Sequence, residues 1–402
     1  MINVTEKAAS LGGDMAELRH ALHREPETGL QLPGTQARVL DALDGLPLEI
    51  STGDSLTSVT GVLRGARPGP VVLLRADMDA LEIEEKTGVA YASQNDAMHA
   101  CGHDLHTAML VGAAHVLASA RDELAGSVLF MFQPGEEAWD GAGHMIREGV
   151  LDAAGTRPVA AYALHVMSRG WPHGRFTTRP GPMLAASDAL TVTVHGTGGH
   201  GSAPYLARDP VLAACEMALA LQTFLSRSVD PLEPVVLTVG SFHAGVRNNV
   251  IPDTASFDAT IRTFSQEVRD LVARGTVRVC EGIAAAHGLE VDAVCTPQYP
   301  VTVNDGAEAA FAGEAVADLF GGDAFTPMAK PLTGAEDFSR VIAEVPGAMV
   351  FLSAVPPGSD YESLPNNHSQ YAVFDDGVLG AGAALYAGLA LRRLAAEIPA
   401  SA

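Results

Sequence analysis

The stretch Val71-Val-Leu-Leu-Arg-Ala-Asp77 begins with four apolar residues, ends in charged ones, and decides the class of fold. Two further runs, at 128–132 and 348–352, are almost continuously apolar and are bounded by turn residues. Strands of this kind are buried on both faces, as in a parallel sheet covered by helices. Helical patterns rich in Ala, Leu and Met separate them, for example at 107–120 and 378–394. We therefore predict an α/β fold built on a mainly parallel sheet.

The middle of the chain carries a different pattern. In Ala255-Ser-Phe-Asp-Ala-Thr-Ile261 apolar and polar residues alternate, and residues 190–194 alternate in the same way. Alternation marks a strand with one buried and one wet face, which is typical of an antiparallel sheet. Helical patterns accompany these strands at 210–225 and 266–287. This part of the chain is therefore predicted to be α+β.

Turn residues punctuate both ends of this part, with Pro180-Gly-Pro182 before it and Thr296-Pro297 after it. We therefore predict two domains. Residues 183–296 form an inserted domain, and residues 1–182 and 297–402 form a discontinuous outer domain.

Composition excludes several classes of protein. The chain has 402 residues, 47% of them hydrophobic and 18% charged, so it can bury a sizeable core and is too apolar to be disordered. Lys and Arg number 25 against 48 Asp and Glu, which gives a net charge of −23. Because such a field repels polyanions, we expect neither nucleic acid nor an anionic membrane as a partner.

Three features bear on the compartment. The first twenty residues scatter acids and bases where a secretory signal needs a continuous hydrophobic segment. The longest uncharged apolar stretch, 378–391, falls short of the roughly 20 residues that cross a bilayer and is predicted to be a buried helix. Four cysteines in so long a chain fit a reduced compartment, and Cys215, Cys280 and Cys295 fall in apolar patterns predicted to be core. We expect a cytoplasmic protein.

The densest group of potential metal ligands is His99-Ala-Cys101-Gly-His103-Asp104-Leu-His106. Thiolate and imidazole together favour a borderline-soft ion such as zinc, and the glycine between Cys101 and His103 lets the backbone turn tightly. Asp104 is predicted to be the N-cap of the helix that follows. Spacing alone fits equally well a capping loop with surface histidines.

Further candidate ligands follow predicted strands, where open α/β sheets place their sites. Glu136 and Glu137 come after the strand that ends at Phe132, and His165 follows the strand through Leu164. One of two adjacent carboxylates can bind metal while the other acts as a general base. Taken alone, the pair fits a solvated acidic loop better, but its coincidence with the Cys-His group favours a site.

Three other residues are weaker candidates. Asp77 and Asp79 follow the first apolar run, where turn chemistry or N-capping explains them as well as metal chemistry does. His368 stands in a loop before the last helix, and alone it fits a residue near a helix cap.

Together these motifs make the chain recognisable. It resembles the M20 family of metallopeptidases, in particular its amidohydrolase branch of hippurate hydrolases, aminoacylases and auxin-conjugate hydrolases. The resemblance spans nearly the whole chain and rests on motifs in a fixed order: Leu22-His-Arg-Glu-Pro-Glu27, Arg75-Ala-Asp-Met-Asp-Ala-Leu81, His99-Ala-Cys-Gly-His-Asp104, Phe132-Gln-Pro-Gly-Glu-Glu137, Ala163-Leu-His165, Asn249-Val-Ile-Pro252, Glu336-Asp-Phe338 and His368.

The resemblance implies a site for two divalent metal ions, with zinc favoured by the thiolate and imidazole ligands and manganese as the alternative. The residues implied as ligands are Cys101, which bridges the ions, His103, Glu137, His165 and His368. Glu136 is then the general base. Asp79 would orient a histidine ligand through its second ring nitrogen, and Asp77 would be structural.

The resemblance also assigns roles in the inserted domain, which in the family is a ferredoxin-like lid and dimerisation domain. His200, often supplied by the partner subunit, faces the developing oxyanion. The family usually has histidine after Pro204, whereas this chain has Tyr205 and so lacks the imidazole that makes the family's contact there. Asn249 and Arg262 match substrate-binding positions, although Arg262 also fits the exposed face of an alternating strand. A homodimer through this domain is expected, because its sheet edge must be paired or protected.

The leading hypothesis is a metal-dependent amidohydrolase that cleaves the amide bond of small N-acyl or N-aroyl amino acids. A metallo-carboxypeptidase or dipeptidase is the alternative within the same class, and a non-hydrolytic metal-binding protein that uses Cys101 is an alternative outside it. The glycine fingerprint at 196–201 formally matches a dinucleotide-binding turn. We expect no nucleotide there, because the predicted helix begins only near Asp209 instead of opening directly from the turn.

Overall fold

The computed structural model describes residues 2–396 and divides into two compact units. The outer unit contains the residues up to Met183, Val303–Lys330 and those from Asp337 onward. The inserted unit contains Leu184–Thr302 and Pro331–Glu336. The short strands β7 (Gly181–Leu184) and β14 (Thr302–Asn304) pair where the chain passes between the two units.

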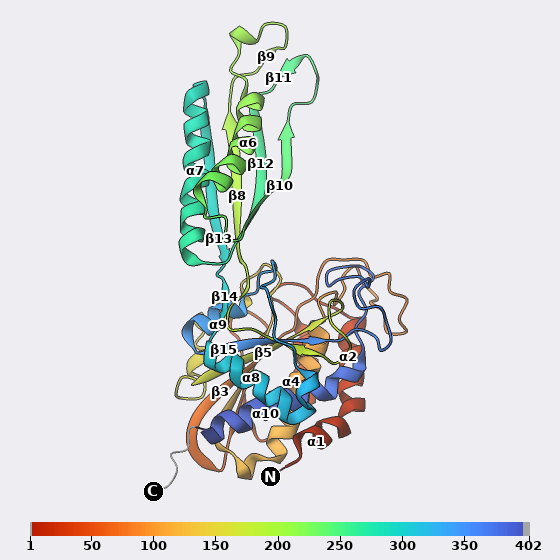
Figure 1. Cartoon of the computed structure of the whole chain (residues 1–402). Coiled ribbons are helices and arrows are strands. Elements are labelled where there is room, and N and C mark those ends of the chain that lie inside the picture. The colour runs from red at the N-terminus through yellow and green to blue at the C-terminus, as the bar shows by residue number, and fades with distance from the viewer. Residues whose placement is uncertain (1, 397–402) are drawn as a thin grey trace. The chain divides into compact units, whose positions relative to one another are not determined.

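A seven-stranded sheet forms the centre of the outer unit (Figure 1). In spatial order its strands are β1 (Leu48–Thr52), β2 (Val59–Arg64), β4 (Ala125–Gln133), β3 (Arg67–Asp77), β5 (Ala160–Met167), β15 (Gly347–Ser353) and β6 (Phe176–Thr177). Only β2 and β6 run against the other five. The three apolar runs of the sequence lie in β3, β4 and β15 and are fully buried, so the predicted mainly parallel sheet is confirmed.

Helices cover this sheet. They are α1 (Val4–Ser10), α2 (Gly12–Arg24), α3 (Pro33–Leu43), α4 (His103–Ser119), α5 (Gly141–Arg147), α8 (Gly306–Phe320), α9 (Phe338–Glu344) and α10 (Leu379–Ala396), with short 3-10 turns at Arg121–Glu123, Val150–Asp152, Gly322–Ala324 and Asp376–Val378. The two most deeply buried helices, α4 and α10, pack against each other and against β3 (Figure 1).

The predicted buried helix near the C-terminus is confirmed as α10. Among the described residues, the segment Asp376–Ala396 is the one that is long and apolar enough to cross a membrane, but 67% of its most apolar window is buried inside the fold. Its apolar character is thus explained by its place in the core.

One prediction about α4 is wrong. The helix begins at His103 rather than near residue 107, and its N-cap is Gly102, in the left-handed conformation at φ 82° and ψ 21°. Asp104 therefore lies in the first turn and does not cap the helix. Its carboxylate instead accepts hydrogen bonds from Arg19 Nε at 3.0 Å and His23 Nδ1 at 2.8 Å.

The inserted unit has the α+β order of a ferredoxin-like fold, as predicted. Its elements are β8 (Ala186–His195), α6 (Pro210–Ser228), β10 (Val235–Ala244), β12 (Thr254–Thr263), α7 (Gln266–His287) and β13 (Glu290–Tyr299). The strands form an antiparallel sheet in the order β10-β12-β8-β13, and both helices pack on its apolar face.

The segment between β8 and α6 is irregular. It contains only β9 (Gly199–His200) and a 3-10 turn at Pro204–Leu206, and α6 starts after its N-cap Asp209. The glycine fingerprint therefore does not open into a helix. Cys280 is buried and Cys295 is partly buried, but Cys215 is exposed on α6, so its predicted place in the core is wrong. Its neighbours Ala213, Ala214 and Met217 are buried, whereas Cys215 and Leu212 lie on the exposed side of the helix.

Candidate metal centre

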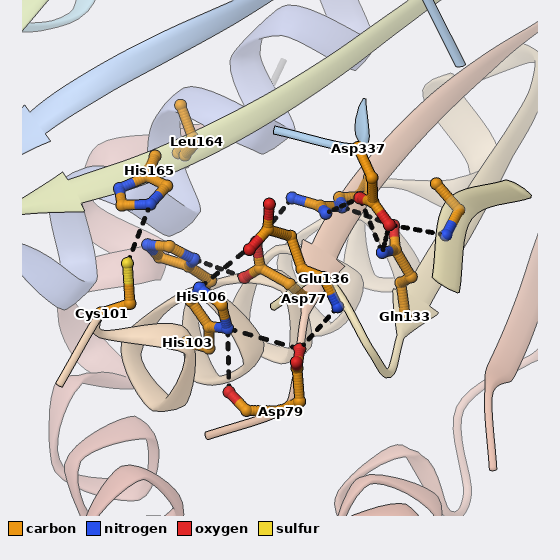
Figure 2. Close-up of polar contacts among 12 residues, drawn as sticks. Asp77, Asp79, Cys101, His103, His106, Gln133, Glu136, Leu164, His165 and Asp337 are labelled. Atoms are coloured by element: carbon orange, nitrogen blue, oxygen red, sulfur yellow. Dashed lines mark hydrogen bonds and ion pairs between the residues drawn. The ribbon is translucent and has the colours of Figure 1, made fainter. Parts of the chain in front are cut away.

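Polar residues gather where the parallel strands of the outer unit end (Figure 2). Strand β3 ends at Asp77, β4 is followed by Glu136 and Glu137, and β5 carries His165 near its end. The loop before α4 brings Cys101 to the same edge. This is the edge at which open α/β sheets place their functional sites.

The structure brings Cys101, His103 and His165 together, with one potential ligand atom from each within 4.8 Å of the others. Cys101 Sγ lies 3.4 Å from His165 Nε2. A second group of the same kind contains Cys101, Glu137 and His368. In it His368 Nε2 lies 3.2 Å from Cys101 Sγ and 3.1 Å from Glu137 Oε1. The two groups share one sulfur, which is the arrangement that two ions bridged by a thiolate require.

The imidazole orientations fit metal binding. His103 Nδ1 donates to the backbone carbonyl of Asp79 at 2.8 Å, and His165 Nδ1 donates to the carbonyl of Val166 at 2.8 Å. Each ring then directs Nε2 toward the other ligands, as metal-binding histidines do. Within the described part of the chain, the buried Nε2 of His103 has no hydrogen-bond partner. Such a costly buried lone pair is explained if it binds an ion.

The electrostatics of the group point the same way. Burial acts to raise the pKa of the Cys101 thiol, but attraction to His165 and hydrogen bonds with His165 and His368 outweigh it and hold this pKa well below its ordinary value. Hydrogen bonding to Cys101 and Glu137 raises the pKa of His368 to about 10. The thiolate is the form that binds metal. The negative charge of Cys101 and Glu137, which favours a proton on His368, also attracts a divalent cation, and the ion takes the place of that proton when it binds.

Asp79 organises the turn that carries the two glutamates. Its carboxylate oxygens accept the backbone N–H groups of Glu136 and Glu137, each at 3.0 Å. Figure 2 shows the contact with Glu136. The predicted contact with a histidine ligand exists, but it is made chiefly by the backbone carbonyl, since the carboxylate lies 3.5 Å from His103 Nδ1. Glu136 itself is 6% exposed and places a carboxylate oxygen within 4.8 Å of ligand atoms of His103 and Glu137.

The loop that carries His368 is held by its neighbour Asn367. The side-chain amide of Asn367 donates to the carbonyls of Val166 at 3.0 Å and Cys101 at 3.4 Å, and its oxygen accepts the Ser168 N–H. His368 has φ 68°, a left-handed conformation that is uncommon outside glycine. Asn367 therefore ties three ligand-bearing segments together.

The predicted site residues of the inserted unit lie at two separate places in it. His200 pairs with Val250 across strands β9 and β11 (Val250–Ile251), and Gly201 N donates to the carbonyl of Asn249 at 2.9 Å. His200 and Asn249 are thus neighbours. Arg262 lies opposite Ser187, at the other end of β12 from the end that pairs with His195, roughly 26 Å along the strand.

Arg262 is half-buried and hydrogen-bonds the Ser187 hydroxyl, so it is neither a freely exposed residue nor a neighbour of His200. Tyr205, which stands where the resemblance expects histidine, is 83% exposed.

Comparison with known proteins agrees with this geometry. Residues 73–392 match the sequence profile of peptidase family M20/M25/M40. The chain belongs to this family. It is accordingly a metal-dependent hydrolase of amide bonds, and the alternative of a non-hydrolytic metal-binding protein is set aside.

Two curated relatives of the M20 chain cover almost its entire length. It is 36% identical to "Thermostable carboxypeptidase 2" of Saccharolobus solfataricus over 94% of both chains. It is 35% identical to the hippurate hydrolase of Campylobacter jejuni, over 98% of this chain and all of that one. Among solved structures, a dinuclear metal-binding peptidase of the M20 family from Bacillus subtilis superposes with a TM-score of 0.82 at 31% identity, covering 97% of this chain and 100% of the other.

The sequence did not predict a buried ionic network that includes Asp104, the residue after the ligand His103. His23, from the first M20 motif, places Nδ1 2.8 Å from Asp104 and Nε2 3.2 Å from Glu85. Burial acts to lower the pKa of His23, but the charge and hydrogen bond of Asp104 outweigh it and raise this pKa to about 9. Arg19 shares the same Asp104 oxygen. The motif itself was the available signal, since it singled out His23 without giving it a role.

Proposed function

We propose that the protein hydrolyses the amide bond of small N-acyl or N-aroyl amino acids with the help of two divalent metal ions. The observation that carries this proposal is the pair of ligand groups that share Cys101, with the Glu136 carboxylate beside both Glu137 and His103. The hippurate hydrolase relative supports this substrate class, because hippurate is an N-aroyl amino acid.

In this proposal Cys101, His103 and His165 hold one ion, and Cys101, Glu137 and His368 hold the other. Two bound ions supply Lewis acidity toward the scissile carbonyl and toward the attacking water. The Glu136 carboxylate accepts a proton from that water and then returns it to the nitrogen of the leaving amine. Asp79 keeps the Glu136 carboxylate in place by holding the backbone of its turn.

The donor set favours zinc. A thiolate and three imidazoles are ligands of borderline-soft ions, whereas Glu137 alone supplies the hard oxygen that manganese prefers. Manganese remains the alternative, since availability also decides which ion a site holds.

We further propose that His200 donates a hydrogen bond to the oxyanion, that Asn249 and Arg262 bind the substrate, and that the protein is a homodimer through the inserted unit. The neutral His200 ring suits this role. Its Nδ1 accepts from the backbone N–H of Ser202 at 3.1 Å and lies 2.8 Å from the Ser202 hydroxyl, so Nε2 carries the proton that a donor needs. The edge strands β10 and β13 need pairing or protection, which supports a dimer.

A carboxypeptidase or dipeptidase is the second candidate. The relative from Saccharolobus solfataricus, at 36% identity, is named a carboxypeptidase, and both reactions hydrolyse an amide next to a small carboxylate-bearing product. The two candidates differ in what lies on the acyl side of the bond.

A substrate panel separates them. The enzyme is stripped with a chelator, reconstituted separately with zinc, manganese, cobalt or nickel, and assayed on N-benzoylglycine, N-acetyl amino acids, free dipeptides and N-blocked dipeptides. We expect turnover of the simple acyl and aroyl amino acids to exceed that of the peptides. A preference of ten-fold or more for either peptide class assigns the second function instead.

The role of Glu136 is tested by two neighbouring variants. We expect Glu136→Gln to keep both ions while hydrolysis falls by about 10² to 10⁴. The matched Glu137→Gln should lose metal as well as activity, because it removes an anionic ligand. Near-normal turnover by metal-replete Glu136→Gln excludes Glu136 as the base.

A mixing experiment tests His200 and the dimer together. Glu136→Gln and His200→Ala subunits, each inactive alone, are combined under conditions that allow subunit exchange. If His200 serves the partner's site, mixed dimers regain one working site and part of the activity. No recovery in verified mixed dimers shows that each chain uses its own His200, and failure to form dimers at all rejects the proposed assembly.

A further inference from the structure

The pairing between strands β3 and β5 ends just before the metal ligands. They pair from Val72 opposite Ala160 to Arg75 opposite Ala163. Past this point two side chains enter between them. The Tyr386 hydroxyl donates to the carbonyl of Arg75 at 2.6 Å and accepts the N–H of Leu164 at 2.9 Å. Nearer the metal ligands, the ring of His106 bridges the Val166 N–H and the Asp77 carboxylate in the same way. Figure 2 shows its contact with Asp77.

Both ring nitrogens of His106 are used in this bridge. The backbone N–H of Val166 donates to Nε2 at 2.7 Å, so Nε2 carries the lone pair and the ring is neutral. Nδ1 then donates to Asp77 Oδ1 at 2.5 Å. His106 is fully buried and makes these two contacts from α4, whereas Val166 and Asp77 belong to the two separated strands.

The second carboxylate oxygen of Asp77 is also engaged in a hydrogen bond. It accepts from Arg75 at 2.6 Å, and Arg75 in turn donates to Asp337 at 2.9 Å. Asp77, His103 and His106 have potential ligand atoms within 4.8 Å of one another and thus resemble a third ion site. The hydrogen bonds contradict that interpretation, because His106 has no lone pair left and Asp77 already faces a guanidinium.

We propose that His106 is a positioning residue of the metal centre, which holds the Val166 N–H and thereby fixes the adjacent ligand His165 at the distance from α4 that a shared ion requires. The inference rests on the proposed metal-dependent function. His103 and His106 are three residues apart on α4 and project from the same face, so one helical turn supplies one ligand and orients a second. The His106 and His165 rings lie 4.8 Å apart between centroids.

Strand β5 has a regular partner on only one side at His165, which explains why a further hydrogen bond is needed on the other side. On the β15 side His165 pairs with Phe351 in the regular parallel ladder. On the β3 side the ladder has ended, so His106 and Tyr386 replace the missing strand at Val166 and Leu164. Without His106 the Val166 N–H would be buried without a partner, and β5 would be free to shift at the residue next to the ligand.

The test compares three variants. His106→Leu removes both hydrogen bonds. His106→Gln is the conservative variant, because its amide oxygen and nitrogen flank one carbon as the two ring nitrogens do. The control is Thr107→Val, which is also fully buried and removes only the hydrogen bond from Thr107 Oγ1 to the carbonyl of Asp77 at 3.0 Å, on the β3 side.

For each purified variant, zinc per chain and the dissociation constant of each ion are measured by chelator competition, without substrate, together with the thermal midpoint. We expect His106→Leu to bind one of its two ions about 10 to 100 times more weakly and His106→Gln to recover most of that loss. Thr107→Val should lower the thermal midpoint and leave both dissociation constants unchanged.

Several results overturn the proposal. Wild-type affinity for both ions in folded His106→Leu, or equal weakening in Thr107→Val, would reduce His106 to a structural residue. If the leucine variant does not fold, equally weakened binding of both ions in folded His106→Gln decides against the proposal, because the amide should restore the two hydrogen bonds. If the wild type binds three zinc ions per chain and either His106 variant binds two, His106 is itself a metal ligand and the proposal is wrong. A wild type that binds two ions without cleaving N-acyl amino acids defeats the proposed substrate class only, whereas fewer than two ions defeats both proposals.

Discussion

Gly102 is a residue of the metal centre at which the fold leaves no room for a side chain. It stands between the ligands Cys101 and His103 and adopts φ 82°. A Cβ atom there would lie 2.3 Å from Cγ2 of Val166, the residue next to His165. Gly102→Ala therefore adds one methyl group at a point where three ligand-bearing segments meet.

The expected cost has two parts. A residue with a Cβ in the left-handed region costs about 1–2 kcal/mol, and forcing a methyl group into a packed site costs about 1–3 kcal/mol more. The total is about 2–5 kcal/mol. Gly88 isolates the first part, because it has φ 76° but nothing within 4 Å of the added Cβ. Gly88→Ala should thus cost only about 1–2 kcal/mol.

The second part should appear in metal binding. Relief of the contact requires either Val166 or the segment around Gly102 to move, and both adjoin ligands. Since about 1.4 kcal/mol corresponds to a tenfold change in affinity, a contact of 1–3 kcal/mol predicts zinc binding weaker by about tenfold to a hundredfold.

Thermal unfolding and zinc titration of the wild type, Gly102→Ala and Gly88→Ala provide the measurement. We expect both variants to be destabilised, Gly102→Ala more so, and only Gly102→Ala to bind zinc weakly. Equal thermal midpoints for the two variants, with wild-type zinc affinity in both, would refute the reasoning, because the backbone would then have room that the structure denies.

Three further expectations can be checked. Cys101→Ser should lower the zinc content, because an alcohol is a poorer anionic ligand than a thiolate; unchanged stoichiometry by metal analysis contradicts the bridging role. The pKa of His23 is raised from 6.5 to about 9, so the stability it contributes, up to about 3 kcal/mol, is complete below pH 6.5 and lost as pH rises through 9. Denaturant titrations from pH 6 to 10 should show that His23→Gln lacks this alkaline decline in the free energy of unfolding. If the wild type and His23→Gln lose stability in parallel as pH rises, His23 is not its source. Ala138, directly after the ligand Glu137, has φ 70°, so Ala138→Gly should raise the free energy of unfolding by about 0.5–1 kcal/mol; a lower denaturation midpoint contradicts this.

The predictable part of the fold follows from local patterns. The runs in β3, β4 and β15 contain no polar positions, and only a sheet covered on both faces can bury them. The alternation in β12 likewise predicts one covered face, which α6 and α7 provide. The grouping of the candidate ligands was predictable for a similar reason, since carboxyl ends of parallel strands meet at one edge.

What escaped prediction depends on contacts between distant segments. Asp104 has the residue type and place of an N-cap, but Arg19 and His23 engage its carboxylate from α2, which no local pattern reveals. Asn367 donates to the backbone carbonyl of Cys101, and His106 accepts the backbone N–H of Val166. A hydrogen bond to a backbone group does not depend on the side chain of that residue and so leaves no mark in the sequence. The sequence fits Arg262 equally well as a substrate-binding residue or as a residue on the exposed face of a strand, and its hydrogen bond to Ser187 is visible only in the structure.

The carboxylates around the centre explain why it should favour soft ions. Asp79 uses both oxygens on the amides of Glu136 and Glu137, and Asp77 uses both on Arg75 and His106. With these oxygens engaged by the protein, the groups that converge on the ions are mainly sulfur and imidazole nitrogen. Magnesium and calcium require six or more oxygen ligands, so we expect millimolar amounts of either to displace no zinc in a metal-exchange assay. Displacement would mean that Asp77 or Asp79 turns toward the ions. The aspartates of this site thus act by holding other residues in place: Asp79 fixes the turn of the two glutamates, and Asp77 holds His106.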